Sequence, residues 1–211
     1  AASGLDGMRA SISKSDRDGG PFGPRWSCAY DQRLQVYDDG TIGYLQADGA
    51  TFYFTEQPDG TYRGNDDDFL RIIQDAAHEY FHVVRPDSTA YYFDASGYLV
   101  KILHPQGTET VLERTGLGIL EAVVSPGGLR LTVESDPYGR ITKLTAPDGG
   151  ETLYGYDGEL LTTVTGPDGG QTRYEYDVRG YKRARADTHG GMHAQNTYDR
   201  AGAAAHRTHA S

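Results

Sequence analysis

The sequence predicts an all-β protein in which antiparallel β-hairpins stack into a curved, open sheet of repeats. Of its 211 residues, 28 are glycine and 16 are tyrosine, a composition typical of strands joined by tight turns. Aspartate also opens successive copies of one pattern, 21, 20 and 22 residues apart, at Asp136, Asp157, Asp177 and Asp199. A period of this length indicates stacked supersecondary units that bury their apolar faces on their neighbours.

We expect residues 1–93 to form an N-terminal β region that contains a plug loop. Residues 17–31 read RDGGPFGPRWSCAYD, the densest cluster of glycine, proline and aromatic residues in the chain. Glycine and proline disfavour regular structure there, whereas the large aromatic side chains are costly to leave in water. The loop is therefore predicted to fold onto a core through Gly20, Phe22, Gly23 and Trp26.

Three Asp-Gly turns punctuate the residues that follow the plug loop. They lie at 38–40, 47–49 and 58–60, and the runs that precede them, 33–37, 42–46 and 51–55, are predicted to be short antiparallel strands. The acidic run 65–68 lacks the alternating ligands of a calcium loop, so we expect a solvated loop.

Residues 78–82 read HEYFH, which matches the HExxH pattern of zinc hydrolases. That chemistry needs His78 and His82 on one face of a helix, whereas on a strand they would lie roughly 13 Å apart. Strand-forming runs at 80–84 and 89–93 flank a Pro-Asp turn, so we favour a β-hairpin. We expect no catalytic residue, metal or cofactor, and keep a zinc hydrolase as the alternative that a helix would support.

Residues 94–199 are predicted to be diverged and then regular repeat hairpins, followed by a tail at 200–211 in which the strand signal fades. In a regular copy an Asp-Gly turn precedes a strand, Pro-Asp-Gly-Gly reverses the chain, and a return strand ends in Tyr-Asp. The repeated structural residues are Tyr156, Asp157, Tyr176, Asp177, Tyr198, Asp199, Gly149 and Gly169.

These recurring residues resemble the YD repeat of the RHS family. The segment GPFGPRWSCAYD at 20–31 is similar to the GPFGxGWxxxYD opening of the domain that precedes such repeats, with Pro24-Arg25 as a departure. The resemblance implies a hairpin sheet that, in longer members, coils into a hollow shell around a toxic C-terminal domain. The family's Asp-Pro self-cleavage motif is not recognisable, because the single Asp-Pro, at Asp136, opens a repeat in mid-chain.

We therefore predict a non-enzymatic structural module, secreted or at the cell surface, that is part of an RHS-type shell or of a self-associating extracellular assembly. An open sheet leaves an unpaired strand at each end, and such edges pair with other chains. The expected partners are further YD-repeat chain or identical subunits, and the resemblance adds an enclosed toxin domain. A net charge of −10 argues against nucleic acid, and no apolar run reaches the roughly 20 residues of a membrane span.

The tyrosines of the repeats suggest a second function. Tyr154 and Tyr174 recur at the repeat period, and an exposed aromatic row would bind the sugar rings of a cell-surface glycan. In the other interpretation, which we favour, these rings pair across strands and stiffen the sheet by about 0.2–1 kcal/mol per pair. Carbohydrate binding stays the alternative function.

Overall fold

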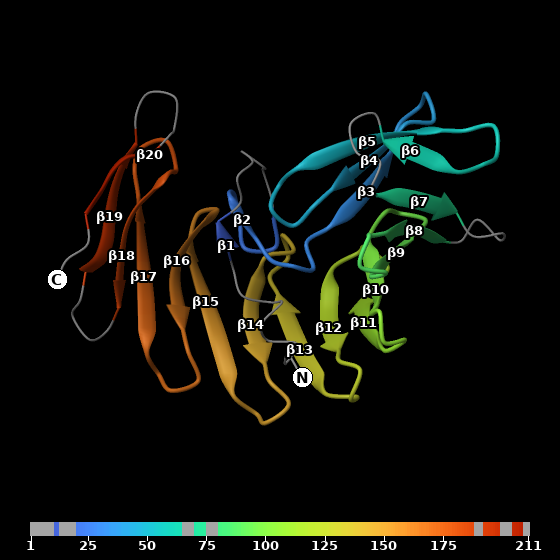
Figure 1. The fold of residues 1–211 in the computed structure, drawn as a ribbon. Helices are drawn as coiled ribbons and strands as arrows, with labels where there is room; N and C mark the ends of the chain where they lie inside the picture. Colours follow the sequence, from blue (N-terminus) through green and yellow to red (C-terminus); the bar gives the residue numbers. More distant parts are fainter. Residues whose placement is uncertain are drawn as a thin grey trace.

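The computed structural model describes residues 11–12, 20–64, 70–74, 80–187, 192–198 and 204–208, and all the regular elements in these ranges are β-strands (Figure 1). The strands are β1 (Ser11–Ile12), β2 (Trp26–Ser27), β3 (Arg33–Val36), β4 (Ile42–Leu45), β5 (Thr51–Glu56), β6 (Tyr62–Gly64), β7 (Arg71–Gln74), β8 (Tyr80–Val84), β9 (Ala90–Asp94), β10 (Leu99–Leu103), β11 (Glu109–Arg114), β12 (Leu120–Val124), β13 (Arg130–Ser135), β14 (Ile141–Thr145), β15 (Glu151–Asp157), β16 (Leu160–Thr165), β17 (Gln171–Tyr176), β18 (Lys182–Asp187), β19 (Met192–Tyr198) and β20 (Ala204–Thr208). No described segment is a helix long and apolar enough to span a bilayer.

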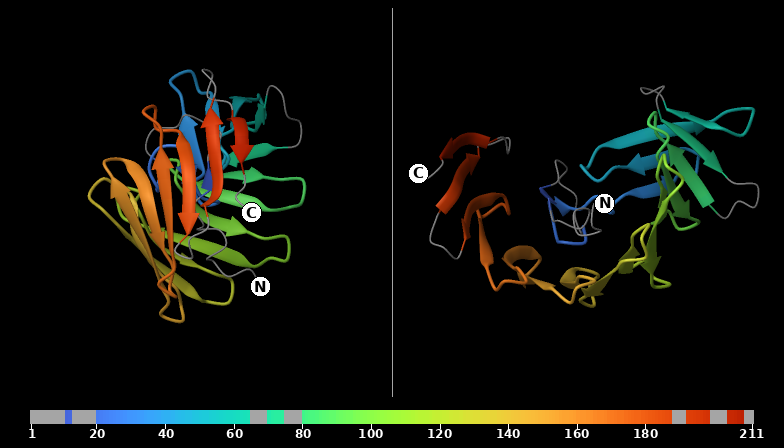
Figure 2. Two further views of the ribbon diagram at one scale, coloured as in Figure 1. Left: turned by 90° about the vertical axis from the view of Figure 1, so that its left-hand side faces the viewer. Right: turned by 60° about the horizontal axis from the view of Figure 1, so that its bottom comes forward.

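The strands from β3 to β20 form one curved sheet in which each strand pairs antiparallel with its neighbours in sequence. Figure 2 shows the wall bending around a concave side, with β1 and β2 as a separate small pair inside it. In the described residues no ladder joins β20 to β3, so the sheet is open. The predicted fold class, stacked hairpins in a curved open sheet, is confirmed.

The sheet curls so strongly at its beginning that β3 returns to the turn between β9 and β10. The backbone N–H of Leu34 donates to the carbonyl of Gly97 at 2.9 Å, and Arg33 forms a single β-bridge with Tyr98. A Cβ atom on Gly97 would lie 1.9 Å from the Leu34 carbonyl oxygen, closer than atoms can approach. Glycine is thus required where the first edge strand meets the sheet.

The hairpin turns repeat one geometry, as their sequences predict. In the turn at 146–150 the N–H of Gly149 donates to the Ala146 carbonyl at 2.9 Å, and the carboxylate of Asp148 accepts from the N–H of Gly150 at 2.9 Å. The turn at 166–170 has the same bonds. Gly149 and Gly169 have φ values of +86° and +78°, a conformation that glycine adopts without strain. Aspartate and glycine are turn formers here.

Two boundaries differ from the sequence prediction. The division expected between residues 93 and 94 falls inside β9, and the sheet continues across it without a break. The tail at 200–211 contains a strand, β20, which pairs with β19 through Thr197 and His206. Main-chain pairing with an existing edge overrides the low strand propensity of the alanines there. Asp199 and the acidic run 65–68 lie outside the described residues.

Candidate functional site

The plug loop folds back into the concave side of the sheet, where it packs against the regular repeats. Figure 2 places the blue N-terminal segment inside the curve of the wall. The carbonyl of Pro21 accepts a hydrogen bond from the N–H of Ile141 at 2.7 Å. Phe22 is fully buried, and its ring centroid lies 4.9 Å from that of Tyr154. In the described part of the loop, Phe22 and Trp26 are both buried in the core of the sheet.

Trp26 is the second aromatic anchor of the plug loop. Its ring centroid lies 4.9 Å from that of Tyr174 at an interplanar angle of 60°, a tilted arrangement that aromatic pairs favour. Its indole Nε1 donates to the Tyr176 hydroxyl at 2.9 Å. The Nζ of Lys182 lies 5.6 Å from the indole centroid, within the range of a cation–π contact. One buried side chain therefore links the plug to both β17 and β18.

Close backbone contacts also fix the plug loop. The N–H of Gly23 donates to the Gly20 carbonyl at 2.9 Å, and a Cβ on Gly23 would lie 2.3 Å from the Glu159 carbonyl oxygen. Gly23 also has φ of +85°, so its glycine identity is doubly required. Arg25 has φ of +65°, and its guanidinium carbon lies 3.6 Å from the Tyr181 ring centroid.

Tyr156 and Tyr176, the tyrosines of two successive Tyr-Asp pairs, share one hydrogen-bonding role. The hydroxyl of Tyr156 donates to the carbonyl of Ile141 at 2.6 Å, and that of Tyr176 donates to Leu161 at 2.5 Å. In each case the acceptor lies 15 residues earlier, on the adjacent strand of the same hairpin. Arg114 makes the equivalent contact from Nε to Leu99, also 15 residues earlier. The sequence did not identify Arg114, because it replaces tyrosine in a diverged copy.

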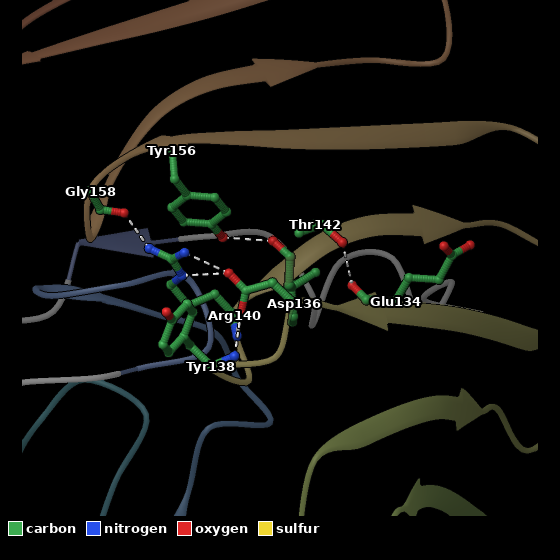
Figure 3. A network of polar contacts seen from close by, with 8 residues as sticks. Glu134, Asp136, Tyr138, Arg140, Thr142, Tyr156 and Gly158 are labelled. Carbon is green, nitrogen blue, oxygen red and sulfur yellow. Dashed lines mark hydrogen bonds and ion pairs between the residues drawn. The ribbon is translucent and has the colours of Figure 1, made fainter.

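Arg140 joins the turn that contains Asp136 to the neighbouring turn that contains Gly158 (Figure 3). Its guanidinium forms an ion pair with Asp136 at 2.6 Å and donates to the carbonyl of Gly158. It also lies 4.7 Å from the ring centroid of Tyr156. Burial alone would raise the pKa of Asp136, but the hydrogen bonds from Arg140 and from two backbone N–H groups outweigh it and lower the pKa. Asp136 is therefore a charged structural group.

Cys28 is a buried residue of the plug loop itself. Burial disfavours the thiolate and, together with the nearby Asp31 carboxylate, raises the pKa of the thiol to about 12. The thiol stays protonated at neutral pH, which removes the nucleophilic form. An adjoining cavity of about 300 Å³ is lined by Cys28, Asp31 and Arg114.

The helical interpretation of the HExxH motif is wrong at His82. This residue lies in β8, pairs with Ile73 and Tyr92 in the two adjacent strands, and has its ring centroid 5.0 Å from that of Tyr92. The predicted hairpin of residues 80–84 and 89–93 is the observed β8–β9 pair. His78 lies outside the described residues. Among the described residues, no three histidine, cysteine, aspartate or glutamate side chains lie together in a group that could hold a metal ion.

Neither interpretation of the repeat tyrosines describes the geometry of Tyr154 and Tyr174. Tyr154 is 8% exposed and lies opposite Val164, whereas Tyr174 lies opposite Arg185. They therefore form no Tyr–Tyr pair across strands, and they present no open row for a sugar. The reason is that the plug aromatics occupy the inner face, as the Phe22–Tyr154 and Trp26–Tyr174 contacts show.

Comparison with known proteins gives matches of limited extent. A family model described as a domain of unknown function, DUF6531, matches residues 7–54, a range that includes the plug loop and most of β5. Comparison with curated proteins finds no match. Among solved structures, TcdB2-TccC3-TEV is similar at 12% identity and a TM-score of 0.42, covering 84% of this chain and 11% of that chain. Structures of TcdB2-TccC3, and of TcdB2-TccC3 without its hypervariable C-terminal region, are similar at 15% identity and a TM-score of 0.39, covering 79% of this chain. This chain spans 12% of the length of each.

Proposed function

We propose that this chain is a non-enzymatic wall segment that begins an RHS-type shell and closes the shell's first end. The observation that carries the proposal is the packing of Phe22 and Trp26 against tyrosines of two successive repeats. The loop that precedes β3 thus covers part of the wall's concave face. The resemblance of the Tyr-Asp repeats to the RHS family supplies the architecture that such a wall would continue.

The two ends of the sheet support different roles. The first strand, β3, is held by Gly97 and Tyr98 of the same sheet. The last strand, β20, pairs with β19 on one side, and among the described residues no strand pairs with its other side. A free strand edge is a template for further strands. We propose that further YD-repeat chain or an identical subunit continues the wall there, outside the cell or at its surface, around an enclosed toxin domain.

The inner face supports a structural role rather than catalysis. Catalysis requires polar groups that converge on a space where a substrate can lie. On the described inner face the aromatic rings are packed, and the cavity beside them is lined by the protonated thiol of Cys28 and by Arg114, whose guanidinium donates to the carbonyls of Leu99 and Gly118. These groups stabilise a wall.

Light scattering at a series of concentrations tests this proposal. A wall segment with a free β20 edge is expected to associate end to end, so its mass should rise with concentration. A chain that stays monomeric at high concentration would argue against the proposal. Elemental analysis provides an independent check of the enzyme alternative, because stoichiometric zinc would favour a hydrolase over a structural module.

A further inference from the structure

A groove of about 670 Å³ lies beside the first strand of the sheet, away from the plug loop. Its walls come from β3, from the neighbouring β4 and β5, and from the turn at 94–97. Phe81 of β8 contributes to the lining. This volume is in the range of pockets that bind ligands in proteins.

The outer edge of β3 borders this groove. In an antiparallel strand the backbone groups of alternate residues point to the same edge. The N–H of Leu34 points outward to Gly97, so the N–H and carbonyl of Val36 point outward as well. In the described part of the chain, no backbone hydrogen bond reaches this edge beyond Leu34. Pairing of the edge therefore starts at Leu34 and stops where the groove begins.

The side chains of β3 show that an apolar neighbour is missing at the same place. Leu34 and Val36 lie on one face of the strand, yet Leu34 is 3% exposed and Val36 is 56% exposed. On the opposite face the exposed rings of Tyr37 and Tyr53 lie with their centroids 6.2 Å apart. Apolar surface is therefore open on both sides of the unpaired edge, which is an arrangement that proteins normally cover.

We propose that this groove binds an extended polypeptide segment, which adds to the outer edge of β3 as a further strand. The segment would continue the pairing that Gly97 and Tyr98 begin, and its main chain would bond the outward groups of Val36. Alternate side chains would cover Val36 and Phe81 on one face and the Tyr37–Tyr53 pair on the other. The preferred segment is therefore uncharged, free of proline, and rich in β-branched or aromatic residues at consecutive positions.

Selection from a displayed library of random nonapeptides tests this site. The enriched peptides are expected to match the stated composition, and one is then synthesised with capped ends and titrated by fluorescence anisotropy. The variant Val36→Pro removes the outward donor but leaves the pairing with β4, and should weaken binding at least about tenfold. Val36→Thr keeps the donor and serves as the matched control, with a smaller loss.

N-methylation of the peptide gives a second test that leaves the protein unchanged. Methyl groups on the amides that face β3 should abolish binding, whereas methyl groups on the alternate amides should leave the affinity within about threefold. Failure to enrich any peptide would overturn strand addition. So would a peptide that binds Val36→Pro as tightly as the parent chain and binds equally well with either set of amides methylated. Equal affinity would instead assign the groove to ring stacking, as for a sugar. The inference does not depend on the proposed function, because the probe binds at β3 and association is expected at β20.

Discussion

The indole Nε1 of Trp26 donates a hydrogen bond of 2.9 Å to the hydroxyl of Tyr176, although 150 residues separate them in sequence. The same hydroxyl donates to the carbonyl of Leu161 at 2.5 Å. The plug loop is thus connected through one tyrosine to the backbone of the neighbouring strand. Because the proposed seal consists of such contacts, its energetics can be measured one group at a time.

Substitution of Trp26 separates ring packing from hydrogen bonding. Trp26→Ala removes the buried ring and should lower the free energy of unfolding by about 3–5 kcal/mol. Trp26→Phe keeps an aromatic ring against Tyr174 and loses the N–H donor, so we expect a loss of about 1–2 kcal/mol. Urea unfolding followed by tyrosine fluorescence measures both variants. Equal stability of Trp26→Ala and the parent chain would contradict the packing described here.

Removal of the Tyr156 or Tyr176 hydroxyl leaves a backbone carbonyl without its side-chain donor. Tyr156→Phe should lower the free energy of unfolding by about 1 kcal/mol, and Tyr176→Phe by about 1–3 kcal/mol, because it also leaves the Trp26 Nε1–H without its acceptor. Tyr138→Phe is the matched control. Tyr138 is 85% exposed, so removal of its hydroxyl should change stability by less than about 0.5 kcal/mol. If Tyr156→Phe and Tyr176→Phe lower the free energy of unfolding no more than Tyr138→Phe does, the hydroxyl contacts do not stabilise the fold.

The ion pair of Asp136 and Arg140 predicts a dependence of stability on pH. The pKa of Asp136 is lowered in the folded chain, so its contribution is complete above the unfolded pKa and is lost as the pH falls through the folded pKa. Asp136→Asn should cost about 1.5–3 kcal/mol near neutral pH. The difference from the parent chain should shrink below about pH 4. A difference that stays constant down to the acid transition would contradict the assignment.

Ser88 occupies a turn position at which the other described hairpins place glycine. It has φ of +65°, and its N–H donates to Arg85 at 3.0 Å as the equivalent glycines do. Since a left-handed conformation costs an L-residue about 1–2 kcal/mol, Ser88→Gly should raise stability by about 0.5–1 kcal/mol after the greater freedom of unfolded glycine is subtracted. The control Gly107→Ser, at φ of +79° with open space around it, should lower the melting temperature.

The local structure of this chain could be predicted from its sequence, because turns and strands depend on neighbouring residues. Pro-Asp-Gly-Gly predicts the turns that contain Gly149 and Gly169, and both have the expected positive φ. The strand formers around His82 likewise indicate a hairpin and outweigh the HExxH pattern. The aromatic residues of the plug loop predict that Phe22 and Trp26 are buried.

The partners of those aromatic residues could not be predicted, because repeat periodicity does not encode the curvature of the sheet. The curvature brings the plug loop to Tyr154 and Tyr174, which explains why an exposed row or a cross-strand ladder was the wrong expectation. It also brings Leu34 to Gly97, a contact that covers part of an edge expected to be free. Strand propensity missed β20 because pairing with β19 supplies its stability.

Small-angle X-ray scattering of the double variant Phe22→Ala/Trp26→Ala tests the central claim most directly. If the plug loop holds the open wall in its curve, removal of both rings should increase the radius of gyration while circular dichroism still shows the β-sheet content of the parent chain. An unchanged scattering curve from a variant with intact β-sheet would contradict the claim that this loop closes the first end of the wall.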